Sequence, residues 1–236
     1  MRTMNIKAGS GQSEICIGES AANIKNYCGG KKAIIIADRN AISAHRQRLK
    51  GLDAFHIIEI DGSEEAKTLK TVEGIYLEFL KSHIDRSSLV IGMGGGVVTD
   101  ITGFAASTFK RGIQFGLVPT TLLGQADASI GGKNGVNLLG YKNIVCTIRQ
   151  PKFVICDFEF LETLPEREIR CGFAEIIKHG AIADGKLFMF IEENQKKAMS
   201  LHKSVLEKIL NDSIAVKAKI VETDETEKGE RAKLNF

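Results

Sequence analysis

The chain has 236 residues, 43% hydrophobic and 26% charged, a composition typical of a soluble globular protein of one or two domains. Its formal charge is only +3, and its lysines and arginines are spread along the sequence, which argues against a nucleic-acid-binding surface. Five cysteines without a Cys-x-x-Cys pair argue against a disulfide framework or a thiolate metal site, and the lack of a long apolar run or a signal-peptide core predicts a cytoplasmic protein that does not associate with membranes.

Short apolar runs alternate with helical patterns over roughly the first 160 residues. Ala66–Ile84 carries apolar residues three and four positions apart, which predicts an amphipathic crossover helix, and Val97–Thr108 has similar spacing. This alternation predicts an α/β fold with a mostly parallel, Rossmann-like sheet that binds a nucleotide at its strand C-terminal ends. The expected strands are Ile15–Ile17, Ala33–Ala37, Phe55–Ile60, Leu89–Ile91, Phe115–Val118 and Phe153–Ile155.

The pattern becomes purely helical after Asp157. Thr163 and Glu166 form a capping-box pattern with Pro165 in the first turn, which predicts a helix beginning at Thr163. Leu187–Ile191 and Leu201–Val221 also have helical spacing. We therefore predict two domains, an α/β nucleotide-binding domain at 1–160 and an incomplete all-helical domain at 161–236.

A glycine-rich turn follows the fourth expected strand. Gly94, Gly95 and Gly96 stand where a strand passes into a helix, and we expect them to adopt positive φ and to bind phosphate at the helix N-terminus. Val97 replaces the third glycine of the Gly-x-Gly-x-x-Gly pattern, so a plain tight turn stays an alternative. Asp100 fits either a ligand contact or a partner of the helix dipole.

Three further groups of polar residues allow both a functional and a structural interpretation. Asp127, Lys133, Lys142 and Asn143 surround two glycines, a pattern that suits an anionic substrate but also a surface loop. Glu175, Lys178 and His179 share a helix face, which is typical of a solvated salt bridge, and a Glu–His pair alone is too few ligands for zinc. A solvated basic face is the simplest interpretation of Lys217, Lys219, Lys228 and Arg231.

Five blocks resemble the 3-dehydroquinate synthases, of the sugar-phosphate cyclase group: Gly94–Phe104, Lys110–Leu123, Asp127–Asn137, Thr163–Lys178 and Glu227–Phe236. The resemblance implies a lyase that uses NAD and a divalent metal, usually zinc and in some cases cobalt. Such enzymes convert 3-deoxy-D-arabino-heptulosonate 7-phosphate into 3-dehydroquinate and phosphate in the shikimate pathway of aromatic amino acid biosynthesis, and they act as homodimers.

The resemblance also implies roles for single residues. Glu175 matches a metal ligand, and Arg111 matches a residue that reaches the substrate phosphate of the neighbouring subunit. The cofactor-binding positions are Asp38, Asn40, Glu64, Lys67, Gly94, Gly95, Gly96, Asp100, Thr120, Thr121, Lys142, Asn143 and Thr163. The substrate-binding and catalytic positions are Asp127, Lys133, Lys178, Lys217, Arg231 and Asn235, together with Arg111.

The family pattern continues beyond Leu-Asn-Phe with two Gly-His motifs that supply further metal ligands, whereas this sequence stops at Phe236. His179 is expected to substitute poorly, because it shares a helix turn with Glu175 and does not converge from elsewhere. We therefore expect NAD binding but no turnover by this chain. Two alternatives stay open: another cyclase or a metal-dependent polyol dehydrogenase of the same fold, and a non-catalytic NAD-binding module.

Overall fold

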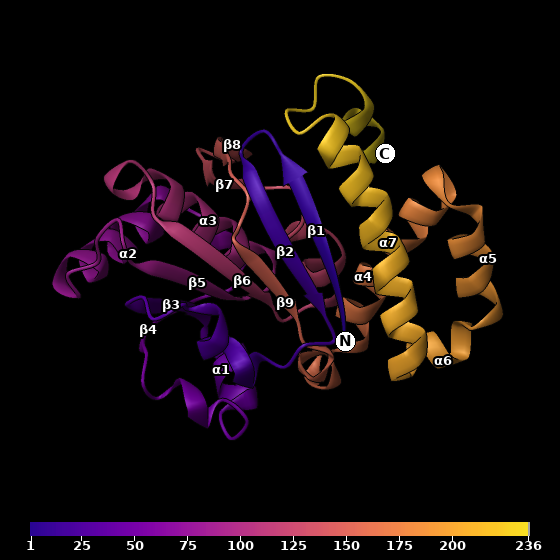
Figure 1. Ribbon diagram of the computed structural model, residues 1–236, viewed down its shortest axis with the longest axis horizontal. Coiled ribbons are helices and arrows are strands. Elements are labelled where there is room, and N and C mark those ends of the chain that lie inside the picture. Colours follow the sequence, from indigo (N-terminus) through magenta and orange to yellow (C-terminus); the bar gives the residue numbers. More distant parts are fainter. Residues whose placement is uncertain (236) are drawn as a thin grey trace.

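A seven-stranded sheet forms the centre of the molecule (Figure 1). The computed structural model describes residues 1–235, with the side chains of all of these except Lys50 and Asn235. The strand order is β1-β2-β9-β6-β5-β3-β4, and only the β1–β2 pair is antiparallel. The strands are β1 (Arg2–Ala8), β2 (Gly11–Ile17), β3 (Ala33–Asp38), β4 (His56–Ile60), β5 (Leu89–Gly94), β6 (Gln114–Pro119) and β9 (Phe153–Cys156). The predicted α/β class and mostly parallel sheet are confirmed.

The parallel register brings the predicted cofactor residues to one edge of the sheet. Ala37 on β3 is level with Met93 on β5, and Gly94 is level with Pro119 on β6. The chain therefore leaves three neighbouring strands at the same edge, beside Asp38, Gly95 and Thr120. This is the edge at which open parallel sheets bind ligands.

The helices cover both faces of the sheet, and α4 to α7 gather on the side where β1 lies (Figure 1). On α2 the buried residues Val72, Ile75 and Phe79 repeat at three and four positions, so the predicted amphipathic helix is confirmed with shorter bounds. The helices are α1 (Arg39–His45), α2 (Leu69–Lys81), α3 (Gly96–Thr108), α4 (Glu166–Ala183), α5 (Gly185–Glu193), α6 (Gln195–Met199) and α7 (Lys203–Thr223).

One apolar core connects the sheet with the later helices. Ile34 and Ile36 belong to the same cluster of buried side chains as Phe173 on α4 and Ile214 on α7. The predicted boundary between 160 and 161 stays a prediction. Across residues 1–235, none of the helices combines the length and the apolar character that a bilayer span requires.

Three strands were not predicted, and the start of one helix was predicted wrongly. The sequence pattern did not predict β1 or the separate hairpin β7 (Lys133–Leu138) and β8 (Tyr141–Ile148), whose second strand is largely exposed and so lacks an apolar signature. Helix α4 begins at Glu166 with Pro165 as its N-cap rather than at Thr163. Thr163 ends a preceding 3₁₀ turn, and its hydroxyl lies 2.8 Å from His45 Nε2, so it does not cap α4.

Candidate active site

The glycine turn between β5 and α3 needs glycine for space rather than for backbone conformation. None of Gly94, Gly95 and Gly96 has positive φ, contrary to expectation, and Gly95 has φ −71° and ψ −173°. A Cβ on Gly94 would lie 2.7 Å from Val98 Cβ, and one on Gly95 would lie 3.2 Å from Thr121 Cγ2. The N-terminus of α3 has no side-chain cap, so its amides are suited to a phosphate group.

Lys67 joins three separate elements at this edge of the sheet. The lysine is 5% exposed, and its Nζ lies 2.5 Å from Asp100 Oδ2 on α3 and 2.6 Å from Asn143 Oδ1 on β8. Burial raises the pKa of Asp100 to about 6, against the opposing effect of the Lys67 ammonium. The structure thus brings together three of the predicted cofactor residues.

The tip of the β7–β8 hairpin is tied to the segment before α2. Asn137 Nδ2 donates to Glu64 Oε1 at 2.8 Å, and Asn137 Oδ1 accepts from the amide of Asn143 at 2.8 Å. Lys142 is exposed, with its Nζ 3.9 Å from Glu64 Oε1. Asn137 was not among the predicted site residues, although it ends the Asp127–Asn137 block.

Three other predicted cofactor residues make local structural contacts. Asp38 is the N-cap of α1, and its Oδ1 accepts from the amide of Asn40 at 2.8 Å. Thr121 Oγ1 accepts from the amide of Gly124 at 3.0 Å. Thr120, which is 4% exposed, continues from the end of β6, where its amide donates to Gly94 O at 3.0 Å. These contacts hold the backbone at the sheet edge in place.

The second group of predicted site residues surrounds Asp127, which lies on a π-helical turn, η5 (Gly124–Ala128). Lys217 on α7 donates to Asp127 Oδ1 and also to the backbone oxygen of Asp127, at 2.6 Å. Burial opposes ionisation of Asp127, but Lys217, His179 and Lys178 together hold its pKa below the usual range. Short π-helical turns occur frequently at functional sites.

The interpretation of the basic residues as a solvated face was wrong for two of them. Lys217 is 6% exposed and Arg231 is 2% exposed, and burial lowers the pKa of each. Lys219, two residues along α7 from Lys217, is exposed as expected. The helical pattern placed these lysines on α7 but did not indicate that η5 would cover one of them.

Helix α4 contributes its predicted triplet to the same cluster. Lys178 Nζ lies 2.5 Å from Glu175 Oε1 and donates to the Leu234 carbonyl at 2.6 Å. His179 is fully buried, with Nε2 3.5 Å from Glu175 Oε1 and 3.9 Å from Asp127 Oδ1. Burial again opposes ionisation of Glu175, yet His179 and Lys178 lower its pKa. The triplet is therefore not a solvated surface face.

These positions create a group of donors suited to a divalent cation. One ligand atom each from Asp127, Glu175 and His179 lies within 4.8 Å of the others. His179 shares a helix turn with Glu175, as expected, and the donor that converges on this pair from another element is Asp127 on η5. Carboxylate and imidazole donors suit zinc and similar divalent ions.

The side chain of Arg231 packs against the loop that follows η5. Its guanidinium donates to Gly131 O at 2.9 Å and to Glu225 O at 2.6 Å. Gly131 has φ +97°, and a Cβ there would lie 2.7 Å from Arg231 Nη2, so glycine is required. Lys133 points instead toward Glu227, with its Nζ 2.5 Å from Oε2.

Two predicted site residues remain. Arg111 is exposed on the short turn after α3, at φ +66°. The side chain of Asn235 lies outside the described part of the chain.

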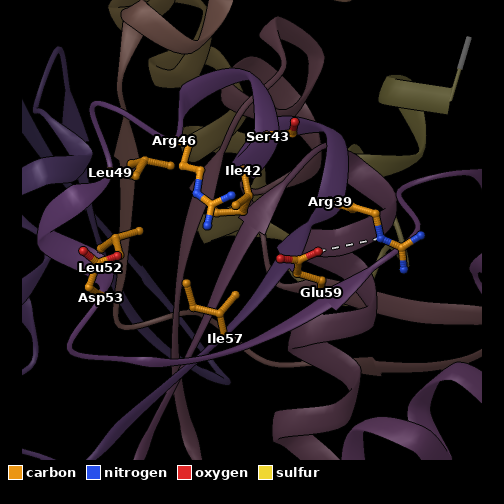
Figure 2. A pocket seen from close by; sticks show the side chains of 9 residues that line it. All are labelled: Arg39, Ile42, Ser43, Arg46, Leu49, Leu52, Asp53, Ile57 and Glu59. Atoms are coloured by element: carbon orange, nitrogen blue, oxygen red, sulfur yellow. Dashed lines mark ion pairs between the residues drawn. The ribbon is translucent and has the colours of Figure 1, made fainter.

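A separate pocket lies beside α1, between that helix and β4 (Figure 2). Its apolar side chains include Ile42 and Ile57, and an Arg39–Glu59 ion pair of 3.7 Å stands at its rim. None of its lining residues belongs to the Lys67 or Asp127 clusters.

The sequence matches the models of two protein-family domains along most of its length. Residues 57–171 match the model of the 3-dehydroquinate synthase N-terminal domain, and residues 172–236 match that of the C-terminal domain. The chain belongs to the 3-dehydroquinate synthase family. The family membership implied by the sequence blocks is therefore confirmed.

Relatives within the family are similar over most of this chain. It is 41% identical to a 3-dehydroquinate synthase of Ruminiclostridium cellulolyticum, over 99% of this chain and 67% of that protein. A 3-dehydroquinate synthase of Acetivibrio thermocellus is 49% identical over 75% of this chain and 49% of its own length. The chain thus spans about half to two thirds of the length of these relatives.

Solved structures share the fold. A 2-deoxy-scyllo-inosose synthase in complex with carbaglucose-6-phosphate, NAD⁺ and Co²⁺ superposes with a TM-score of 0.89 at 27% identity, over 100% of this chain and 66% of that one. A 2-epi-5-epi-valiolone synthase of Streptomyces hygroscopicus with NAD⁺ and Zn²⁺ bound gives 0.88 at 28% identity, over 100% and 68%.

Proposed function

We propose that this chain carries the cofactor- and substrate-binding residues of a 3-dehydroquinate synthase, the lyase that forms 3-dehydroquinate and phosphate from 3-deoxy-D-arabino-heptulosonate 7-phosphate. The observation that carries the proposal is the convergence of Asp127, Glu175, Lys178 and Lys217 from three separate elements beside the Lys67 cluster. Because the chain spans only part of its relatives' length, the reaction itself belongs to the proposal.

NAD would bind along the sheet edge. The uncapped N-terminus of α3 at Gly94–Gly96 suits its pyrophosphate, and Asp38, Asn40, Glu64 and Lys67 suit the adenosine side. The other cofactor positions in the proposal are Asp100, Thr120, Thr121, Lys142, Asn143 and Thr163. Bound NAD supplies transient oxidation of a substrate hydroxyl, and this acidifies the adjacent C–H bond so that phosphate can leave.

A divalent metal, zinc or cobalt, would be held at Glu175, beside the donor atoms of Asp127 and His179. Such an ion acts as a Lewis acid and lowers the pKa of a bound hydroxyl. The carboxylate oxygens of Asp127 and Glu175, which lie close together, are donors that fit this role. The structural relatives named above were solved with NAD⁺ and Co²⁺ or Zn²⁺, which supports the choice of cofactors.

The buried cations suit an anionic substrate. Lys217 has three N–H donors and uses two on Asp127, so one is left for a ligand, and Lys178 is placed similarly by Glu175 and the Leu234 carbonyl. Arg231, with Lys133 and Asn235, would complete the contacts to the carboxylate and hydroxyls of the substrate. Holding the substrate in one conformer in this way favours elimination and ring closure over side reactions.

Arg111 extends the proposal to a partner subunit. Its exposed side chain, on a backbone with positive φ, is free to reach outward from the sheet. We propose a homodimer in which Arg111 contacts the substrate phosphate bound to the partner.

Calorimetric titration tests the proposal. The chain is titrated with NAD, and then with a phosphonate analogue of the seven-carbon substrate in the presence of zinc. We expect both to bind, and the analogue to bind more tightly than a hexose phosphate. Tighter binding of the hexose phosphate would instead favour another cyclase. Binding of NAD without either sugar phosphate would favour a non-catalytic NAD-binding module. Turnover is followed separately as phosphate release.

A further inference from the structure

His179 is the most enclosed side chain of the candidate site. It is 0% exposed on the inner face of α4, one turn after Glu175, where α4 packs against α7. Ring Nδ1 lies 2.8 Å from Ser213 Oγ on α7. Ring Nε2 makes no hydrogen bond of ordinary length to the described residues, although Glu175 Oε1 is 3.5 Å away and Asp127 Oδ1 is 3.9 Å away. Buried polar atoms rarely lack a partner, so this ring nitrogen calls for a functional explanation.

The contacts of the ring determine what Nε2 can do. Ser213 is itself fully buried, and among the described residues its hydroxyl hydrogen-bonds only with His179 Nδ1. When the serine hydroxyl donates to Nδ1, the neutral imidazole carries its proton on Nε2. That N–H then faces the two carboxylates, which accept hydrogen bonds when ionised.

The carboxylates near Nε2 already have ammonium partners. Lys178 lies 2.5 Å from Glu175 Oε1, and Lys217 donates to Asp127 Oδ1. The charges of Glu175 and Asp127 are therefore balanced without a positive charge on His179. Both Lys178 and His179 approach the same oxygen of Glu175, which directs the other oxygen away from them.

We propose that His179 is a positioning residue: its Nε2–H holds the Glu175 carboxylate in the orientation that binds the metal, and Ser213 fixes the ring tautomer. The inference rests on the proposed role of Glu175 as a metal ligand. It assigns to His179 an orienting hydrogen bond rather than a bond to the metal. When a carboxylate or histidine ligates a metal, a hydrogen bond to it from a partner of this kind strengthens the metal binding.

Metal affinity of matched variants tests the inference. His179→Phe keeps a buried ring but removes both nitrogens, whereas His179→Gln keeps an N–H donor near the place of Nε2. We expect His179→Phe to weaken Zn²⁺ binding by about tenfold or more, and His179→Gln to restore most of the affinity. Zn²⁺ binding is measured by competition with a chromophoric chelator, and Glu168→Gln, an exposed position on α4, is the control. Circular dichroism and NAD affinity check that each variant is folded.

Two spectroscopic readouts separate positioning from other roles. Co²⁺ absorption should keep its band positions in His179→Gln, and a shifted ligand-field spectrum would show direct ligation and overturn the inference. Long-range ¹H–¹⁵N correlation spectra should assign the Nε2–H tautomer to His179, with loss of that preference in Ser213→Ala. An Nδ1–H tautomer in the unaltered chain would also overturn it.

Glu175→Gln distinguishes failure of the inference from failure of the proposed metal centre. Loss of Zn²⁺ binding in Glu175→Gln with unchanged affinity in His179→Phe would reject the positioning role alone. Unchanged affinity in Glu175→Gln, or no Zn²⁺ binding by the unaltered chain, would reject both. Loss in Glu175→Gln and His179→Phe, with recovery in His179→Gln, supports the inference.

Discussion

Two carboxylate–lysine pairs, each with a buried lysine, form the two halves of the candidate site, and the pKa values of their carboxylates are shifted in opposite directions. Burial raises the pKa of Asp100 to about 6 in spite of Lys67, whereas the pKa of Asp127 is lowered although burial opposes its ionisation. The difference lies in the surroundings: Asp127 has Lys217, His179 and Lys178 close by, whereas Asp100 is paired with Lys67, and the weaker effects of Lys217 and Asp127 on its pKa oppose each other. The cations near Asp100 therefore do not overcome its desolvation. The first pair anchors a hairpin, and the second belongs to a cationic cluster suited to an anionic substrate.

The largest effect is expected when Lys217 is replaced. Lys217→Met leaves the half-buried, ionised carboxylate of Asp127 without its main partner, so the free energy of unfolding should fall by about 3–5 kcal/mol. Chemical denaturation measures the change, and Lys219→Met on the exposed side of α7 is the control. The double variant Lys217→Met/Asp127→Leu should recover most of the loss. A loss below about 1 kcal/mol in the single variant would mean that the pair is solvated.

The pH dependence of stability should reveal Asp100. Folding raises its pKa from 3.8 to about 6, so between these values the folded chain binds more protons than the unfolded chain. The protonated carboxyl of Asp100 makes its whole contribution to the free energy of unfolding below about pH 4, and this contribution is lost as the pH rises through 6. Compared with Asp100→Asn, the unaltered chain should lose about 3 kcal/mol between about pH 4 and pH 7.5. Denaturation of both proteins across this range measures the difference, and a constant difference would contradict the raised pKa.

Replacement of Lys67 should have a smaller effect than replacement of Lys217. In Lys67→Met, the partly desolvated Asp100 can take up a proton, so we expect a loss of about 2 kcal/mol at neutral pH and less at acidic pH. NAD affinity should also fall, because Lys67 holds Asn143 at the sheet edge. Denaturation and NAD titration measure the two effects. Exposed Lys70 on α2 provides the control variant Lys70→Met. Equal losses at both pH values would argue against proton uptake by Asp100.

The smallest effect on stability is expected at Lys142. This lysine is 76% exposed and 3.9 Å from Glu64, so Lys142→Ala should change the free energy of unfolding by less than about 0.5 kcal/mol. Its proposed role beside the cofactor nevertheless predicts weaker NAD binding, which calorimetry measures. A change in stability without a change in NAD affinity would make the residue structural only.

Much of the fold follows from local apolar patterns. The buried strands Ala33–Asp38 and Leu89–Gly94 consist mainly of apolar residues, and the period of α2 matches its buried face, so these elements were predictable. The strands Arg2–Ala8 and Tyr141–Ile148 were not, because most of their side chains are exposed and their pairing depends on distant segments. The start of α4 was misplaced because Thr163 hydrogen-bonds with His45, a residue far away in the sequence.

The site was less predictable than the fold. Spacing placed Glu175 and His179 on one helix face, but it could not indicate that Asp127 would meet them or that Lys217, 90 positions away from Asp127, would be buried there. Those contacts depend on how α4 and α7 pack over η5. Family resemblance supplied the residue types, whereas the roles of Asn137 and Ser213 could be found only in three dimensions.

The π-helical turn at Gly124–Ala128 limits how this part of the sequence can vary. A π turn contains one residue more than the corresponding α-helical turn, so loss of one residue here would convert it to an α-helical turn. Each residue of an α-helix rotates the chain by about 100°, and the shift would direct the carboxylate of Asp127 away from Lys217. A substitution in η5 keeps the number of residues in the turn, whereas deletion of a single residue would separate Asp127 from Lys217.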